Sequence, residues 1–233
     1  MDLVEALRTT GAVREFTDEP VPDEVLGRIL DAARFAPSGG NRQGWRVVVL
    51  KDPEVRRRLR EIYQDGWYDY LAIASAGMVA FAPLNDRAAE SEAVARGAAE
   101  QRARGEGAAE RGGLAENLER MPVVLVVLAD LRALAAVDRD LERYTFAGGA
   151  SIYPFAWSVL LAARAEGLAG VLTTMAVRHE DRVKELLAVP DELAVAGVLV
   201  LGHPARRPTR LGRRPVPEFT TVDRFDGPEF SAT

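Results

Sequence analysis

The 233-residue sequence contains no cysteine, only two lysines and only two histidines. The absence of cysteine excludes disulfides, thiolate metal sites and a cysteine nucleophile. Neither lysine, Lys51 nor Lys184, follows a glycine, so the GxxxxGK[ST] phosphate-binding loop is absent. The histidines, His179 and His203, lie far apart and share no metal-ligand spacing. We therefore predict no metal site.

Long hydrophobic runs and an excess of positive charge are also missing. The 35 acidic residues outnumber the 30 basic ones, which gives a net charge of -5 and no general attraction to phosphate backbones or anionic lipid. No stretch reaches the roughly 18 apolar residues of a membrane helix, and the N-terminal residues lack the apolar core of a signal peptide. We expect no nucleic-acid partner, no membrane partner and a cytoplasmic location.

Several enzyme motifs are incomplete. The segment 105–107 (GEG) lacks the third glycine of a dinucleotide-binding fingerprint, and 149–153 (GASIY) lacks the last glycine of GxSxG. Three carboxylates, Asp138, Asp140 and Glu142, could act in acid–base chemistry, but they stand among other charges and favour a solvated helix face. Because side-chain chemistry is poorly represented, a cofactor that carries the reaction is the economical alternative.

Helix and strand patterns alternate irregularly over the whole length. The apolar periodicity predicts helices near 3–9, 22–36, 53–64, 150–166 and 180–187, and strands at 46–50, 123–129 and 194–202. It predicts a short strand or a loop at 170–174. The unbroken apolar run 123–129 is typical of a central strand covered on both faces. We predict a single α+β domain over 1–233, with an excursion, helical or mobile, at about 64–118 and an extended tail from about 205.

The excursion is distinguished by composition. Residues 87–116 are rich in Ala, Glu, Arg and Gly and have no stable apolar stripe. This favours a solvated helix or a mobile segment over a part of the core.

Four loop segments carry small residues, polar side chains or fixed positive charge. Such groups suit a ligand with a planar polar ring and a phosphate, although each segment alone also fits an ordinary turn, strand end or solvated tail. The segments contain Arg14; Ser38, Gly39, Gly40, Asn41 and Gln43; Thr173 and Thr174; and Arg213 and Arg214.

The order of these motifs resembles the N-terminal half of the FMN-dependent nitroreductase family. The resemblance begins with Arg14-Glu15-Phe16, continues through PVPDEVL (20–26) and is most specific in AARFAPSGGNRQGW (32–45), which leads into a VVV strand. Farther along, AARAEGLAGVLTT (162–174) and LGHP (201–204) before a basic pair are also similar to that family. Most of the chain outside 64–118 is covered.

The resemblance implies a nitroreductase-like fold: a central, mostly antiparallel sheet flanked by helices, in an intertwined homodimer that binds FMN at the subunit interface. It also implies an FMN-dependent oxidoreductase in which NADH or NADPH reduces FMN, which then reduces an electron-poor small molecule by ping-pong hydride transfer. The acceptor would be a nitroaromatic, a quinone or an activated alkene. Flavin N5 carries the hydride, so no catalytic side chain is expected.

The resemblance also assigns roles to individual residues. Arg14 would place its charge beside the N1 and C2 carbonyl edge of the flavin. The backbone at Leu172, Thr173 and Thr174 would face N5, and Arg213, helped by Arg214, would bind the phosphate. The partner subunit would supply the loop that contains Pro37, Ser38, Gly39, Asn41 and Gln43.

The sequence departs from the family pattern at several positions. Where members often carry Arg-Arg-Ser or Arg-His-Ser, this chain has Thr10, Gly11 and Ala12, so one phosphate contact is missing. Either Arg8 or Thr10 with nearby backbone groups could replace it. Gly44 stands where proline is usual, and SIYPFAWS (151–158) carries aromatics that would line a substrate pocket or belong to the core.

Two alternatives to a reductase remain. One is a flavoprotein of the same fold with different chemistry, such as a dehydrogenase, an oxidase or an enzyme of oxygen-dependent flavin breakdown. The other is a flavin-binding module without turnover.

Overall fold

A computed structural model of the chain describes residues 2–107 and 113–231. Its helices are α1 (Leu3–Thr9), α2 (Asp23–Ala33), α3 (Pro53–Ser75), α4 (Arg87–Glu106), α5 (Leu114–Asn117), α6 (Tyr153–Ala165) and α7 (Glu180–Leu187). Its strands are β1 (Trp45–Leu50), β2 (Val123–Asp130), β3 (Ala169–Thr173) and β4 (Leu193–Gly202). Short 3-10 turns include η1 (Gly39–Asn41), η4 (Ala147–Ser151), η5 (Met175–His179) and η6 (Val216–Phe219). None of the helices described is long and apolar enough to cross a membrane.

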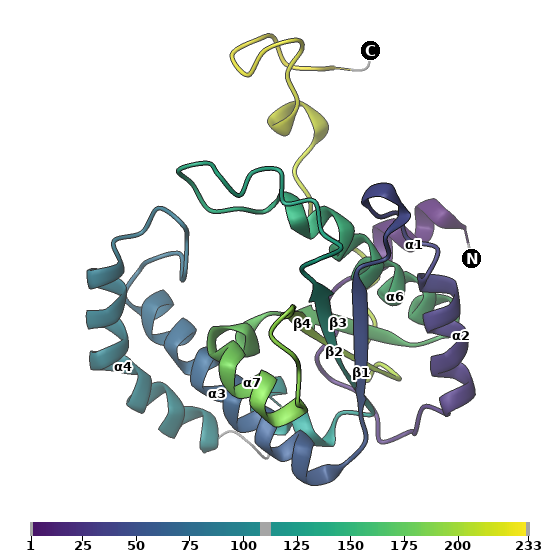
Figure 1. Cartoon of the computed structure of the whole chain (residues 1–233), viewed down its shortest axis with the longest axis vertical. Coiled ribbons are helices and arrows are strands. Elements are labelled where there is room, and N and C mark those ends of the chain that lie inside the picture. Colours follow the sequence, from purple (N-terminus) through teal and green to yellow (C-terminus); the bar gives the residue numbers. More distant parts are fainter. Residues whose placement is uncertain (1, 108–112, 232–233) are drawn as a thin grey trace.

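The four strands form one antiparallel sheet in the order β1-β2-β4-β3 (Figure 1). Every residue of β2 is buried. Its odd-numbered residues, such as Leu125, pack against α2 and α6, and its even-numbered ones, such as Val126, pack toward α3 and α7. Because side chains alternate across a strand, this burial requires helices on both faces. The predicted central strand and the predicted α+β fold are confirmed.

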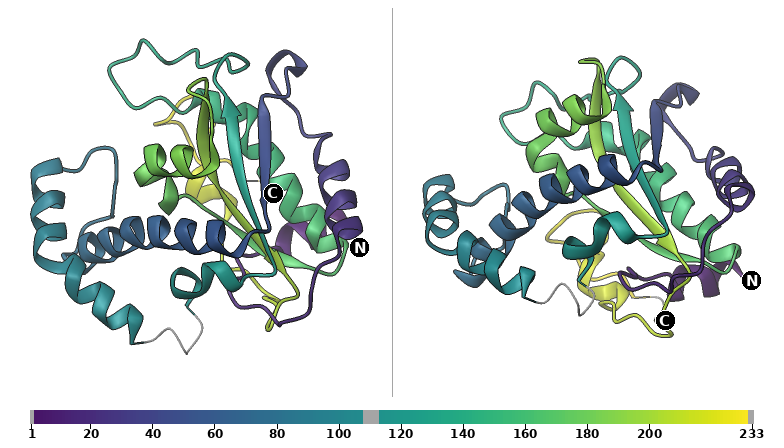
Figure 2. Two further views of the ribbon diagram at one scale, coloured as in Figure 1. Left: turned by 60° about the horizontal axis from the view of Figure 1, so that its bottom comes forward. Right: turned by 90° about the horizontal axis from the view of Figure 1, so that it is seen from below.

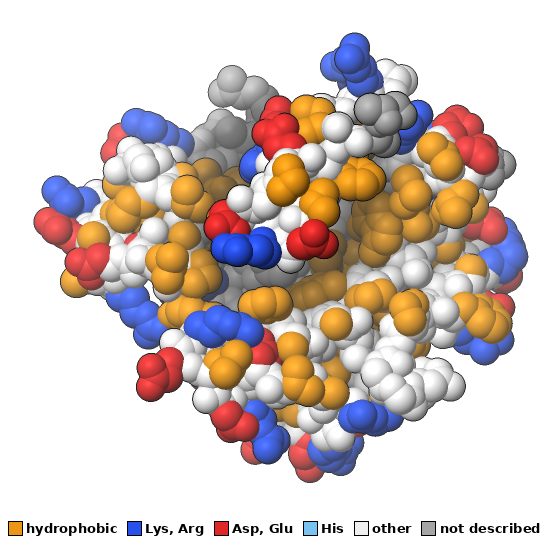
Figure 3. Space-filling model, turned by 90° about the horizontal axis from the view of Figure 1, so that it is seen from above, with side chains coloured by type: hydrophobic (Ala, Val, Ile, Leu, Met, Phe, Trp, Pro, Cys, Tyr) orange, Lys and Arg blue, Asp and Glu red, His pale blue; other side chains and the backbone are white. Residues whose placement is uncertain are grey.

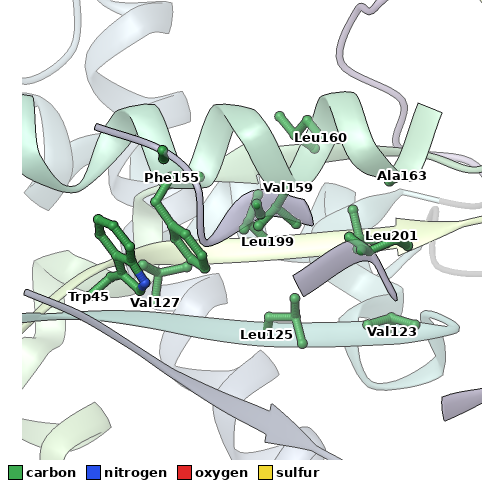
Figure 4. Close-up of a cluster of buried hydrophobic side chains, with 14 of the residues drawn as sticks. Trp45, Val123, Leu125, Val127, Phe155, Val159, Leu160, Ala163, Leu199 and Leu201 are labelled. Atoms are coloured by element: carbon green, nitrogen blue, oxygen red, sulfur yellow. The ribbon is translucent and has the colours of Figure 1, made fainter. Parts of the chain in front are cut away.

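The layer formed by α2 and α6 is packed through aromatic and aliphatic side chains (Figure 4). Trp45 from β1 and Phe155 from α6 stack with ring centroids 4.9 Å apart. Of the three aromatics in SIYPFAWS, Phe155 thus belongs to the core, whereas Tyr153 and Trp157 remain partly exposed.

Helix α3 is longer than predicted, since it runs past the expected end near Gln64 to Ser75. The glycine at 66 suggests a break but lies inside the helix, where a Cβ would overlap the carbonyl oxygen of Met175 in η5. Glycine costs about 1 kcal/mol relative to alanine in a helix. Close packing of α3 against η5 explains why it stands there.

The segment 64–118 combines solvated and buried parts. Helix α4 lies along α3 at the outside of the molecule (Figure 2), and Ala93 is its one residue described as buried. The prediction of a solvated helix is right for α4. It is wrong for Leu114 and Ala115, which join the hydrophobic cluster beneath α3.

The carboxylates at 138–142 do not lie on a helix. Asp138 is 4% exposed, within the loop that joins β2 to η4. It accepts hydrogen bonds from the Thr145 hydroxyl (2.6 Å), the Phe146 amide (2.9 Å) and the Arg143 guanidinium (2.9 Å). The prediction of a solvated face is therefore wrong for Asp138. These donors, led by the Thr145 hydroxyl, hold its pKa well below the usual range.

We expect Asp138→Asn to lower the thermal unfolding midpoint at neutral pH, because one amide oxygen cannot accept all these bonds. A depressed folded pKa means that the carboxylate stabilises the fold above its unfolded pKa of about 3.9 and loses that effect as the pH falls. The difference in midpoint between wild type and variant should therefore shrink below about pH 4. Scanning calorimetry at several pH values measures it. Asp140→Asn, at an exposed carboxylate, is the control, and a pH-independent difference would contradict the assignment.

Candidate functional site

The segment that carries Arg14 is fixed to the sheet by backbone pairing. Ala12 forms a parallel bridge with Gly170 at the start of β3, and the Val13 amide donates to the Gly170 carbonyl at 2.9 Å. A Cβ at Gly170 would overlap the carbonyl oxygen of Val200, so glycine is needed for the close packing of β3 on β4. The parallel register places Arg14 alongside Leu172.

Arg14 and the end of β3 share a cavity of about 540 Å³. Arg14, Leu172, Thr173 and Thr174 line it together, as do residues 113–116 and Met175. The structure therefore brings four of the predicted site residues to one place.

Three aromatic residues of α3 complete the wall of this cavity, and the sequence analysis missed their role. They are Tyr63, Trp67 and Tyr70. The Trp67 and Tyr70 rings are stacked, with centroids 5.4 Å apart and planes within 6°. Their i, i+4, i+7 spacing, which places them on one helix face, is the sequence signal that could identify them. The predicted helix end near Gln64 leaves Trp67 and Tyr70 outside the helix and hides this spacing.

Tyr63 fixes the side chain of Thr173. The Tyr63 hydroxyl is 3.0 Å from the Thr173 hydroxyl. Burial raises the pKa of Tyr63, and the Thr173 hydrogen bond and the Arg14 charge oppose this only in part. The phenol thus stays neutral near pH 7. Arg14 itself has no ion pair with any described carboxylate, so its charge is available in the cavity.

Arg8 and Arg213 meet in a second cavity, of about 800 Å³, between α1 and the tail. The tail can pass here because residue 11 is glycine: a Cβ would lie 2.8 Å from Leu211. Next to it, the buried hydroxyl of Thr10 has no hydrogen-bond partner among the described residues. Arg214 is exposed and lines neither cavity.

The loop from Pro37 to Gln43 lies elsewhere and is tightly held. The Ser38 hydroxyl accepts a hydrogen bond from the Gln43 amide at 3.0 Å, and the Gly39 amide donates to the Ser151 hydroxyl at 3.0 Å. Asn41 and Gln43 have φ of 52° and 50°, which is uncommon for residues other than glycine. Such strain is concentrated at functional sites and persists only where the surroundings enforce it.

This loop precedes β1, whereas Arg14 lies beside β3, and these are the two outer strands of the sheet. Three strand spacings of about 4.8 Å put the edges roughly 14 Å apart. Within one chain, the structure therefore does not bring Pro37, Ser38, Gly39, Asn41 and Gln43 to the residues around Arg14.

The glycine at position 44, where proline is usual in the family, is explained by packing. Gly44 is buried, and its carbonyl accepts a hydrogen bond from the Asp130 amide at 2.7 Å. A Cβ there would lie 3.0 Å from the Cβ of Ala133, which is tighter than ordinary contact. The β2–η4 loop occupies the space that a larger residue would need.

Comparisons with known proteins identify the family. The family model described as "Nitroreductase family" matches residues 7–203. The chain belongs to the nitroreductase family. A protein of Thermus thermophilus named NADH dehydrogenase is 30% identical over 194 residues, which cover 83% of this chain and 82% of that protein. Membership confirms the predicted family and the predicted enzyme class, an FMN-dependent NAD(P)H oxidoreductase.

A shorter match is to a protein that is named for another activity. Iodotyrosine deiodinase 1 of Rattus norvegicus is 38% identical over 64 residues, which cover 28% of this chain and 22% of that protein.

Solved structures share the fold at low sequence identity. The NADPH:FMN oxidoreductase of Vibrio harveyi, complexed with NAD+, has a TM-score of 0.61 and 22% identity and covers 98% of this chain and 79% of its own. An iodotyrosine deiodinase bound to FMN and 3-iodo-L-tyrosine has a TM-score of 0.64 and 21% identity and covers 96% of this chain and 100% of its own. At such identity the likeness shows the fold.

Ser151→Ala tests how the loop around Gly39 is held. Loss of the hydroxyl removes one hydrogen bond, which contributes about 1 kcal/mol. We expect the Gly39 amide to exchange with solvent about fivefold faster, with little change in global stability. Hydrogen exchange followed by mass spectrometry or NMR measures this. Ser158→Ala, in the adjacent helix α6 and with no hydrogen bond to the loop among the described residues, is the control. Equal exchange in both variants would show that Ser151 does not hold the loop.

Proposed function

We propose that the protein is a homodimer in which each FMN binds between two copies of the chain and passes reducing equivalents from NAD(P)H to an electron-poor small molecule. The observation that carries the proposal is the separation of the predicted site residues. Arg14 lies at one edge of the sheet and the Ser38–Gln43 loop at the other. Each chain therefore presents two half-sites, which a second copy can complete.

The residues around Arg14 fit a flavin. A cavity of about 540 Å³ lies within the usual range for small-ligand sites. Its lining includes the stacked Trp67 and Tyr70 rings, whose apolar surfaces suit a planar ring system. It also includes Leu172 to Thr174 and Arg14, whose guanidinium forms no ion pair with a described carboxylate although Glu15 and Glu116 share the lining.

The cavity between α1 and the tail fits a phosphate. Arg8 and Arg213 supply two positive charges there, beside the carboxylates of Asp2 and Glu5. The buried Thr10 hydroxyl, one residue beyond the lining at Thr9, offers a hydrogen-bond donor that has no other described partner. Charge-assisted bonds of this kind are the strong ones in phosphate recognition. Arg8 and Thr10 would thus together take the place of the arginine that the sequence lacks.

FMN, when bound, supplies the hydride-transfer chemistry itself. The chain would bind and orient it. Arg14 places fixed positive charge at one edge of the cavity, and Tyr63 holds the Thr173 hydroxyl in one position. The Trp67 and Tyr70 rings exclude water from one wall, which strengthens the effect of the Arg14 charge.

Exposed hydrophobic side chains support the dimer. Figure 3 shows hydrophobic side chains gathered around a hollow on one face of the molecule. Several large hydrophobic residues in different segments are at least 63% exposed: Phe35, Val137, Phe146, Phe219 and Phe225. Apolar side chains that gather in one patch are typical of a protein–protein interface, and the hollow in Figure 3 is the place where such a contact would form.

The acceptor would be a nitroaromatic, a quinone or an activated alkene. A second candidate is a different flavin reaction on an aromatic substrate, favoured by the 64-residue match to iodotyrosine deiodinase. The two candidates share the cofactor site and differ in the substrate that is consumed.

We expect the purified protein to bind FMN. NADH or NADPH, added under nitrogen, should then lower the flavin absorbance at about 450 nm. Arg14→Ala should weaken FMN binding by about tenfold or more, because a hydrogen bond to a charged group contributes roughly 1.5–3 kcal/mol. It should also slow this loss of absorbance.

Titration with FMN and stopped-flow absorbance measure the two effects. Arg58→Ala, at an exposed arginine of α3 that lines neither cavity, is the control. A wild-type protein that refuses FMN would refute the proposal. Bound FMN that neither nicotinamide reduces would favour the oxidase or the binding module.

The shared site predicts complementation between two inactive variants. In a mixed dimer of Arg14→Ala and Asn41→Ala chains, one site combines both lesions and the other has neither. Random pairing yields mixed dimers as half of the total, so roughly a quarter of wild-type activity should return. Each variant refolded alone provides the baseline. If differently tagged chains pair but activity stays at the baseline, the two half-sites do not combine across the dimer.

A further inference from the structure

A separate cavity, of about 630 Å³, lies next to the candidate flavin cavity. Both are built on α3 and η5: Tyr70 and Met175 line the first, whereas Asp69 and Arg178 line the second. The Tyr70 ring also lies 6.5 Å from the ring of Phe81, which belongs to the second cavity. The two cavities therefore meet at α3, η5 and the Tyr70–Phe81 pair of rings.

Two arginines of the second cavity are stacked on rings instead of paired with carboxylates. The guanidinium carbon of Arg178 lies 4.4 Å from the centre of the Phe81 ring. That of Arg87 lies 5.7 Å from the centre of the Tyr144 ring, and Arg87 also donates to the Tyr144 hydroxyl. Neither forms an ion pair with a described carboxylate.

Neighbouring arginines behave differently, which makes the pair distinctive. Arg96 on α4 is paired with Glu92, and Arg182 on α7 is paired with Asp65. The guanidinium of Arg178 has no hydrogen-bond partner among the described residues, and that of Arg87 uses only one N–H group, for the Tyr144 hydroxyl. The remaining N–H groups can donate to the oxygens of a carboxylate or phosphate.

Two carboxylates, Glu90 and Asp69, also line this cavity and offset part of that charge. Glu90 already accepts hydrogen bonds from the Phe81 amide (2.9 Å) and the Asn85 side chain (2.6 Å). Asp69 is half-buried, and this burial raises its pKa even though His179 and Arg178 lie near it. Asp69 therefore takes up a proton more readily than a solvated aspartate does.

We propose that this cavity binds the oxyanion of a ring-bearing substrate, a carboxylate or phosphate that Arg178 and Arg87 hold beside the flavin cavity. The inference rests on the proposed function for its connection to turnover. The oxyanion has two possible sources: an acidic aromatic acceptor, or the 2′-phosphate of NADPH. Arg178 and Arg87 would then determine which acceptors or which nicotinamide the enzyme prefers.

Equilibrium binding to the FMN-loaded protein, without any reductant, tests the site. The probes are 4-nitrobenzoate against neutral 4-nitrobenzamide, and adenosine 2′-phosphate against adenosine. Calorimetry should show that Arg178→Ala and Arg87→Ala each weaken binding of the anionic probe by about tenfold. Asp69→Asn should strengthen it, because a negative charge is removed. The neutral probes should be unaffected, as should all probes in Arg96→Ala, an exposed arginine that is already paired.

The two pairs of probes show whether the oxyanion belongs to an acidic acceptor or to NADPH. Charge-dependent binding of 4-nitrobenzoate points to an acidic acceptor, and that of adenosine 2′-phosphate points to NADPH; either supports the site. If Arg178→Ala and Arg87→Ala leave both anionic probes unchanged, or weaken the neutral probes equally, the inference is overturned. Because no turnover is measured, a protein that binds these anions but is not reduced by NAD(P)H would count against the proposed function alone.

Discussion

The burial of β2 on both faces is the constraint on which the rest of the structure depends. A strand whose alternate side chains are all apolar needs a helical layer on each side, and α2 with α6 and α3 with α7 provide them. With β2 and β4 in the centre, β1 and β3 become the two outer strands. The residues that line the candidate flavin cavity then come from the edge strand β3, the loops beside it and one face of α3.

The same constraint explains why site residues are separated within the chain. Arg14 reaches β3 through the Ala12–Gly170 bridge, whereas the strained loop at Asn41 leads into β1. A four-stranded sheet cannot bring its own outer edges together without closing into a barrel. A second copy of the chain is the simple way to unite them.

The fold and part of the site could be predicted from the sequence because their signals are local. The unbroken apolar run of β2, the helix pattern of α2 and α7 and the motif that ends at Trp45 depend on residues close in the chain. Tyr70 and Arg178 could not be placed from local signals. Helix α3 continues through Gly66, and that glycine is explained by a close contact with η5, which lies far away in the sequence. Asp138 was misjudged for a similar cause: its partners come from a loop closure that charge spacing does not reveal. The roles of all the predicted site residues toward a cofactor, from Arg8 to Arg214, remain predictions.

The bridge between Ala12 and Gly170 has a further consequence for solubility. An outer strand exposes unpaired amide and carbonyl groups that can pair with another chain, which leads to edge-to-edge aggregation. At β3 the N-terminal segment covers the beginning of this edge, and the Val13 amide uses the Gly170 carbonyl. On β1 the exposed side chain of Arg46 and the adjacent Lys51 make such pairing unfavourable. The residues that position Arg14 therefore also cover this edge of the sheet. Loss of the N-terminal segment would remove a residue of the candidate flavin cavity and also leave a sheet edge open to pairing with another chain.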